Sequence, residues 1–159
     1  MSIDGLASLF SKLDKLNTTI REDLEKSVNE NMKETVQAEA KLLCPVDLGD
    51  LHDSIEVKTE VSDNEIRSTL YTNSDHAPYV EFGTGKVGEE TPVQDKYPGQ
   101  LSYKQDKWLV VIPDVGPRYI AGQPAQPFMY PALKNNEEKV IKDIEKDIKA
   151  TIRRVVKGW

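Results

Sequence analysis

Cysteine and histidine are scarce in this sequence, and their scarcity excludes two common kinds of site. The 159 residues contain one cysteine, Cys44, and two histidines, His52 and His76. One cysteine cannot form a disulfide within the chain, and these three side chains are too few for a structural zinc site of cysteine and histidine ligands. We therefore expect no internal disulfide, no metal and no cofactor.

Long apolar runs are missing as well. The longest, such as residues 108–112, fall far short of the roughly 18 to 20 residues that a membrane-spanning helix needs. The first residues also lack the positive region and apolar core of a signal peptide. These absences predict a protein that is made and kept in a cytoplasm and has no membrane partner.

Basic residues are outnumbered by acidic ones. The chain has 21 Lys and Arg against 27 Asp and Glu, a net charge of −6. This is the wrong overall sign for a protein that binds DNA through its general surface field, so we expect no sequence-specific nucleic-acid partner. Leu, Ile, Val and Phe make up about a quarter of the residues, which is enough for a folded chain. The length fits one domain over residues 1–159.

The spacing of apolar residues predicts two N-terminal helices. Apolar side chains recur every three or four positions over residues 3–16, and every four over most of residues 20–43. Thr19 and Glu22 fit a capping box, so we expect a short first helix and a long second one that starts there. Pro45 ends the second helix, because a proline disfavours helical geometry in the residue before it.

A third helix is predicted at the other end of the chain. Apolar residues at helical spacing over 133–156 indicate an amphipathic helix, with Pro131 in its first turn. An extended connector over 122–128 precedes it, because Pro124 and Pro127 each disfavour helix in the preceding residue.

The middle of the chain reads as strands. Alternating apolar and polar residues over 55–61 and 66–72 predict a β-hairpin. Residues 79–82 favour a third strand that ends at Gly83-Thr84-Gly85, and residues 108–112 a buried fourth strand.

Two segments around these strands are predicted to be irregular. The polar stretch 86–107 has almost no periodicity and reads as a long loop, a candidate to order on contact with a neighbouring protein. Gly116-Pro117 reads as a turn. The order of elements gives an α+β class: two N-terminal helices, a small and mostly antiparallel sheet with a long loop, and a C-terminal helix packed on it.

The class of enzyme that these residue types favour most is a cysteine hydrolase, in which a histidine acts as the base and a carboxylate orients the histidine. The candidates are Cys44, His52, His76, Asp47, Asp53 and Glu81. Their spacing selects no triad, and a cysteine at a helix end before a proline is more typical of a small packing residue. Asp47 is better placed to cap a short helical turn.

Three ordered blocks of sequence carry a resemblance to a known family. The first is Ala40-Lys41 with Cys44-Pro45-Val46-Asp47-Leu48-Gly49-Asp50-Leu51 and Ser54-Ile55, the second is Tyr79-Val80-Glu81-Phe82-Gly83-Thr84-Gly85, and the third is Gly122-Gln123-Pro124-Ala125-Gln126-Pro127-Phe128 with Pro131-Ala132-Leu133. Together they resemble the head-tail joining, or tail-completion, proteins of tailed bacteriophages, which are neck and minor tail components. The resemblance covers residues of about 40 to 135. Leu48 stands where the family usually has Thr, and His52 where it usually has a basic residue.

The resemblance implies a non-enzymatic structural protein of the virion, assembled in the host cytoplasm and placed, as a ring, where the filled head meets the tail. The implied partners are other copies of the chain, a head-closure protein, and a tail terminator or tail tube. Contact with DNA in the channel is expected to be passive.

The residues that match the family's blocks are expected to determine the fold. They are Pro45, Asp47, Gly49, Leu51, Ser54, Tyr79, Glu81, Phe82, Gly83, Gly85, Gln123, Pro124, Pro127, Phe128 and Pro131. The candidate interface residues are Gly122, Ala125, Gln126 and Trp108. We expect the hairpin over 54–72 to supply one side of a ring contact and the connector over 122–128 to lie near the other. Two other functions stay open here: a small Cys-dependent hydrolase and a small acidic regulator that binds another protein.

Overall fold

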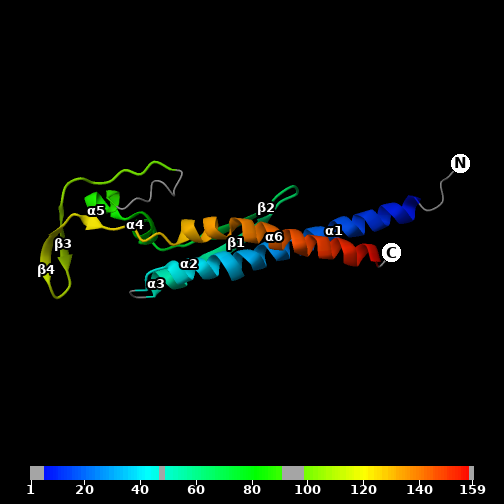
Figure 1. The fold of residues 1–159 in the computed structure, drawn as a ribbon, viewed down its shortest axis with the longest axis horizontal. Helices are drawn as coiled ribbons and strands as arrows, with labels where there is room; N and C mark the ends of the chain where they lie inside the picture. The colour runs from blue at the N-terminus through cyan, green and yellow to red at the C-terminus, as the bar shows by residue number, and fades with distance from the viewer. Residues whose placement is uncertain (1–5, 47–48, 91–98, 158–159) are drawn as a thin grey trace.

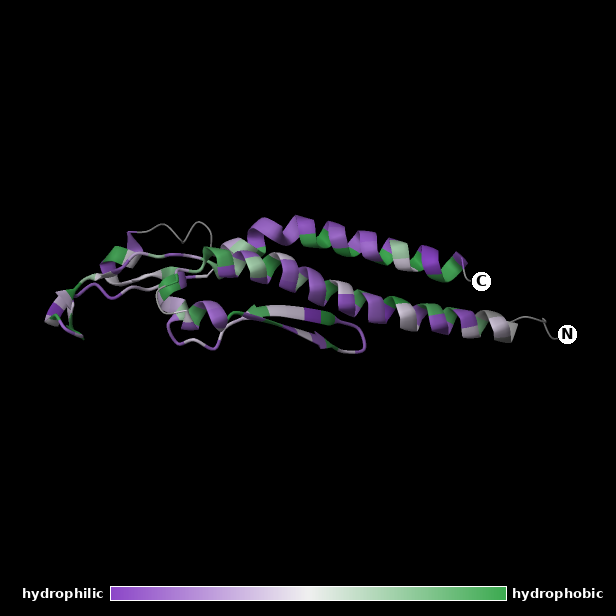
Figure 2. Ribbon diagram, turned by 90° about the horizontal axis from the view of Figure 1, so that it is seen from below, coloured by the Kyte–Doolittle hydropathy of each residue, from purple (hydrophilic) through white to green (hydrophobic). Residues whose placement is uncertain are grey.

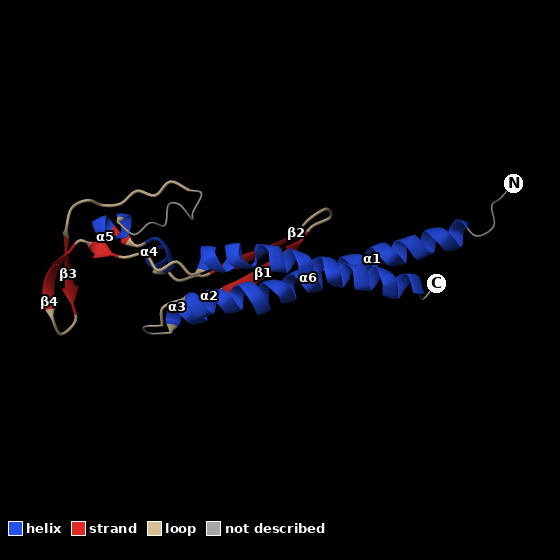
Figure 3. Ribbon diagram, in the orientation of Figure 1, coloured by secondary structure: helices blue, strands red, loops and turns tan. Residues whose placement is uncertain are grey.

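The computed structural model describes residues 6–46, 49–90 and 99–157. The molecule is elongated: two long helices lie side by side over much of its length, and a two-stranded arm projects at the far end (Figure 1). Helices and strands are both present, with most of the strands in two separate antiparallel pairs (Figure 3). The predicted α+β class is confirmed.

The N-terminal member of the two long helices is continuous from Leu6 to Leu43. It consists of α1 (Leu6–Asn31), a π-helical segment η1 (Met32–Gln37) and α2 (Ala38–Leu43). The break predicted near Thr19 was wrong, because α1 runs through it. The hydroxyl of Thr18 donates to the carbonyl of Asp14 at 3.0 Å, so this polar side chain is satisfied inside the helix. Poor helix formers cost only a few tenths of a kcal/mol each, roughly 0.7 at most, which packing along the helix overrides.

The π-helical segment explains how apolar residues four apart stay on one face. Val28, Met32, Val36, Ala40 and Cys44 all belong to the core or pack against it. In a regular α-helix, with 3.6 residues per turn, each step of four drifts about 40° around the axis. A π turn holds more residues than an α turn because its hydrogen bonds span one residue more, so η1 offsets this drift.

A ladder of polar contacts joins this long helix to the C-terminal helix α6 (Met129–Lys157), which runs antiparallel to it. The rungs lie four or eight residues apart along the helix: Asp23 with Thr151 and Arg154, Ser27 with Asp147, Thr35 with Lys139, and Glu39 with Asn135 and Asn136. Asn136 is buried and also donates to the carbonyl of Ala132 at 2.7 Å. The two helices are therefore registered by hydrogen bonds as well as by apolar packing.

The predicted hairpin is present as β1 (Glu56–Val61) and β2 (Ile66–Tyr71), paired from Glu56 with Tyr71 to Val61 with Ile66. The long N-terminal helix lies between this hairpin and α6 (Figure 2). The core sits where these layers meet, around the fully buried Val36, Ile55 and Phe128. The turn before the hairpin is the short helix α3 (Asp50–Asp53), in agreement with the prediction of a turn there.

The third predicted strand was wrong. Residues 77–82 form the helix α4 (Ala77–Phe82), followed by the short helix α5 (Gly85–Glu89). Pro78 lies in the first turn of α4 and Gly83 follows its end with a φ of +71°, and both are helix boundary signals. These boundaries override the β-prone composition of the helix.

The stretch predicted as a loop, 86–107, holds most of α5, and part of it lies outside the described residues. Over 99–107 it has no helix or strand, and the hydroxyl of Tyr103 holds it to α4 by donating to the carbonyl of Phe82 at 2.9 Å. Burial raises the pKa of this Tyr103 hydroxyl, which keeps it protonated as a donor.

The arm consists of β3 (Trp108–Ile112) and β4 (Gly116–Ile120). The strand predicted at 108–112 is confirmed, but it was wrong to expect it buried: Val111 is 72% exposed, because the arm projects beyond the core. The turn lies at Asp114, which has a φ of +62°, rather than at Gly116-Pro117, which begins β4. Proline is tolerated in this strand because β4 is an edge strand.

Candidate functional site

Glu81 ties the second sequence block to the third. Its side chain, only 5% exposed, points from α4 to the start of α6. There its carboxylate accepts backbone N–H groups from Phe128 at 2.7 Å, Met129 at 2.9 Å and Tyr130 at 2.9 Å. The first N–H groups of a helix have no partner within the helix, and the helix dipole favours a negative charge at that end. Glu81 therefore serves as a long-range cap for α6.

Glycines let these two blocks approach each other. The connector forms the short strand β5 (Gly122–Gln123), which bridges to Thr84 and Gly85. A Cβ at Gly122, where φ is +118°, would lie 1.8 Å from the Thr84 carbonyl oxygen, and one at Gly85 would lie 2.2 Å from the carbonyl oxygen of Ala121. Only glycine fits at such distances and at these positive φ values.

The connector is extended, as predicted, and its polar groups are bonded to α4. The side-chain amide of Gln123 donates to the carbonyl of Tyr79 at 2.9 Å, and the backbone N–H of Gln126 donates to the carbonyl of Val80 at 2.8 Å. The side chain of Ala125 is buried, and that of Gln126 is exposed. Of these two candidate interface residues, only Gln126 is open to solvent in the monomer.

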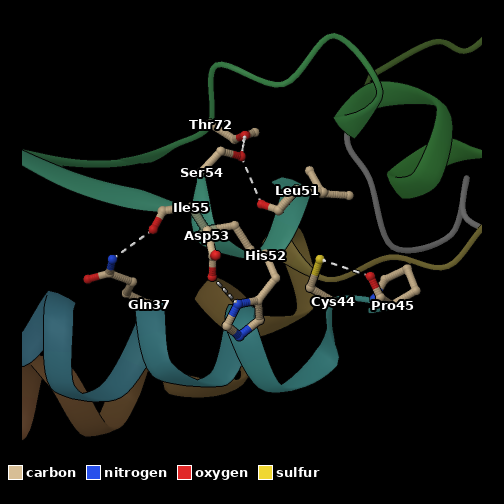
Figure 4. Close-up of polar contacts among 9 residues, drawn as sticks. All are labelled: Gln37, Cys44, Pro45, Leu51, His52, Asp53, Ser54, Ile55 and Thr72. Carbon is tan, nitrogen blue, oxygen red and sulfur yellow. Dashed lines mark hydrogen bonds and ion pairs between the residues drawn. The ribbon is translucent and has the colours of Figure 1, made fainter. Parts of the chain in front are cut away.

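The first block forms the turn between α2 and the hairpin (Figure 4). Gly49 has a φ of +83° and precedes α3. The hydroxyl of Ser54 donates to the carbonyl of Leu51 at 2.8 Å and lies 2.6 Å from the hydroxyl of Thr72, so it joins α3 to the end of β2. The predicted cap, Asp47, lies outside the described residues.

A groove of about 650 Å³ brings the three blocks together. Its lining includes Pro45, Gly49 and Leu51 from the first block, Tyr79, Val80 and Thr84 from the second, Gln123 from the third, and Trp108 and Ile120 at the base of the arm. Two of the lining residues carry groups suited to acid-base chemistry: Asp50 has a carboxylate and His76 an imidazole. A mostly uncharged, open groove of this kind suits contact with another surface better than acid-base chemistry.

Several of the residues that were expected to determine the fold lie outside the groove lining. Phe128 is fully buried in the core, and Pro131 lies in the first turn of α6, as expected. Gly83 has no room for a side chain, since a Cβ there would lie 2.7 Å from the backbone nitrogen of Ala125. These residues hold the groove's walls in place rather than line it.

Cys44 is placed for packing. It is 4% exposed, and burial, with the nearby charge of Glu81, raises the pKa of its thiol. Since the thiolate is the nucleophile, a raised pKa disfavours attack at neutral pH. Figure 4 shows Cys44 with the carbonyl of Pro45 and His52 with Asp53 as two separate pairs, at 3.7 Å and 2.9 Å. Within the described part of the chain, no group of three or more His, Cys, Asp or Glu residues could hold a metal ion.

The comparisons with known proteins bear on residues 7–83, from α1 to the end of α4. These residues match the HK97-gp10-like family model, described as "Bacteriophage HK97-gp10, putative tail-component". This part of the chain is similar to a phage tail-component family. The resemblance to tailed-phage proteins is thereby confirmed, over a segment that contains the first block and the second as far as Gly83, but not the third. No curated protein and no solved structure matches the chain.

The match supports a structural tail component of a bacteriophage, a class of protein that works by contact with other virion proteins. None of the helices in the described residues is long and apolar enough to cross a membrane.

Strand β4, at the base of this region, was not predicted from the sequence. Arg118-Tyr119-Ile120 has the aromatic and β-branched content of a strand, but the preceding Gly116-Pro117 hid it. Pairing with β3 then places Tyr119 opposite Leu109, on one face of the arm.

Proposed function

We propose that this chain is a structural virion protein of a tailed bacteriophage that joins the tail to the DNA-filled head, as a ring at the neck or tail-completion position. Its partners are then further copies of itself, a head-closure protein, and a tail terminator or tail tube. The whole chain, residues 1–159, acts as one unit in this proposal. The observation that carries it is the tail-component match over residues 7–83.

The exposed surface of the monomer supports assembly. It amounts to 11475 Å², whereas a compact monomer of 17.9 kDa exposes about 8,000 Å². A standard interface buries roughly 800 Å² on each partner, and each copy in a ring makes two such contacts. The excess is therefore large enough for two ring contacts and a further contact with a stacked partner.

The charge of the chain fits a passive relation to DNA. With a net charge of −6, a ring of copies repels the phosphate backbone instead of binding it. A negatively charged channel would let DNA pass without binding it.

Electron microscopy of lysates tests this proposal, using a phage that carries a stop codon in this gene. We expect DNA-filled heads and finished tails that are not joined, and joined particles again when the gene is supplied from a plasmid. Tails of abnormal length would contradict the joining role and indicate a tail terminator. Normal infectious particles would contradict any required virion role.

A further inference from the structure

The arm has one face that is apolar and open to solvent. In an antiparallel pair, residues directly opposite share a face, so Leu109 and Tyr119 lie on the same side as Val111 and Pro117. Leu109 is 54%, Val111 72% and Tyr119 72% exposed. The opposite face carries Trp108 and Ile120, which line the groove. The outward face of the arm thus has no cover within the described chain.

Such an arm needs a partner. A two-stranded hairpin by itself is marginally stable in water. Three large side chains more than half exposed, together with Val115 at the tip, present apolar surface on the order of 300 to 400 Å², as much as the largest patch on a typical monomer. An uncovered patch of this size on a projecting element is typical of an interaction surface.

A second uncovered apolar surface lies at the end of α2. Leu42 is 84%, Leu43 41% and Val46 69% exposed, and these residues, which we name the ridge, flank Pro45 at the edge of the groove. The arm projects away from α2, beyond α4 and α5 (Figure 1), so it does not cover the ridge of its own chain.

We propose that the outward face of the arm in one copy packs on the ridge and adjoining groove of the next copy. This inference rests on the proposed ring and names the contact that builds it. Every copy carries both surfaces in equal number, and they differ, so the contact is head-to-tail and propagates until a ring closes. The named residues of the arm face and of the ridge carry no charge, which suits association between chains that each have a net charge of −6.

The exposed area of the chain is large enough for contact with neighbouring copies at both surfaces. An arm contact and a ridge contact of standard size remove roughly 1,600 Å² from each copy. This fits within the excess of about 3,500 Å² over a compact monomer of this mass.

A mixing experiment tests the contact. The arm variant is Leu109→Asp with Val111→Asp, and the ridge variant is Leu42→Asp with Val46→Asp. Each buries two charges in the proposed contact, so we expect self-association weakened about a hundredfold or more, and monomers by sedimentation velocity and native mass spectrometry. Mixed one to one, they should form a dimer and nothing larger, because only the arm of the ridge variant and the ridge of the arm variant remain intact.

Controls separate this contact from folding and from the ring itself. Val156→Asp, near the end of α6, alters a 48% exposed apolar residue that is far from the arm and the ridge and outside the 54–72 hairpin, and it should assemble like the unchanged chain. Circular dichroism should show the same helix content in all variants. A ring that persists in the arm variant would overturn the contact alone and leave the arm to a different virion protein. Two monomeric variants that form no dimer would overturn the head-to-tail pairing. An unchanged chain that stays monomeric would overturn the ring as well.

Discussion

The carboxylate of Glu81 accepts the backbone N–H of Phe128 at 2.7 Å, across 47 residues of sequence. Phe128 is fully buried, and its N–H is the first of three that the same carboxylate satisfies at the start of α6. One side chain therefore fixes the position of the long C-terminal helix relative to α4, and with it the walls of the groove. This contact gives the second and third sequence blocks a common structural role, because it joins a side chain of one to the backbone of the other.

Replacement of Glu81 by Gln should destabilise the protein strongly. The glutamine keeps one acceptor oxygen but turns an NH₂ group toward N–H donors, so at least one buried donor loses its partner. We expect a loss of about 3 kcal/mol in the free energy of unfolding, measured by urea denaturation. Glu145→Gln is a matched control on α6, because its 3.0 Å contact with Lys149 is solvent-exposed and should contribute less than about 0.5 kcal/mol. Equal losses in the two variants would show that Glu81 does not cap the helix.

Gly122→Ala should cost far more than Gly116→Ala. Both glycines have positive φ, +118° and +86°, so both substitutions introduce backbone strain of roughly 1 to 2 kcal/mol. Only at Gly122 would the new Cβ collide, at 1.8 Å, with the carbonyl oxygen of Thr84, whereas Gly116 has open space around it. We expect Gly122→Ala to separate the connector from Thr84, seen as faster hydrogen exchange at the Gln123 amide. Similar exchange in both variants would contradict the close approach.

The helix ladder should make stability fall in acid. Hydrogen bonds from Asn135 and Asn136 lower the pKa of Glu39, and a hydrogen bond from Thr151, with the charge of Arg154, lowers the pKa of Asp23. A carboxyl whose pKa is lower in the folded state contributes stability that is present above its unfolded pKa and lost as the pH falls through its folded pKa. The free energy of unfolding should therefore be steady above about pH 5 and decline below about pH 4.

Glu39→Gln identifies the source of this acid dependence. The variant should be less stable than the unchanged chain at neutral pH, yet lose less stability between about pH 5 and pH 3. Glu34→Gln, an exposed position on the same helix, should leave the acid slope as it is. Urea denaturation at a series of pH values measures all three chains, and parallel slopes for Glu39→Gln and the unchanged chain would exclude the ladder as the cause.

Cys44 should react slowly with thiol reagents. Its side chain is buried and its pKa is raised, so both access and thiolate content oppose the reaction. A chain with Cys44→Ala and Asp63→Cys, which places the thiol in the exposed turn of the β1–β2 hairpin, should label rapidly under the same conditions. In urea the two should react at similar rates. Rapid labelling of native Cys44 would revive the hydrolase hypothesis.

Local patterns predicted the long helices, apart from the break near Thr19, and the β1–β2 hairpin, but not how distant segments meet. Periodicity was sufficient for the long helices and for the β1–β2 hairpin, because each buries one face continuously. Steps of four from Val28 to Cys44 also contained the signal for η1, since a regular α-helix would drift off the core at that spacing.

The lobe that carries the groove was harder to predict. Tyr79 to Phe82 has strand-like composition, and its helix depends on Pro78, Gly83 and the need to aim Glu81 at α6. That need arises from residues almost fifty positions later, which no local window contains. The exposed arm was misread for a related reason: the run at 108–112 looks like a core strand, and nothing within it shows that its partner surface is absent from the monomer.

Salt should favour the assembled state or leave it unchanged. Copies that each carry a net charge of −6 repel one another, and raising the salt from about 0.05 to 0.5 M shortens the Debye length and screens that repulsion. The proposed contact of the arm with the ridge is apolar, so screening removes no attraction from it, and sulfate should strengthen it further. Sedimentation velocity across this salt range measures the result. A ring that dissociates into monomers as salt rises would mean that ion pairs carry the contact, and the apolar arm would then have a different role.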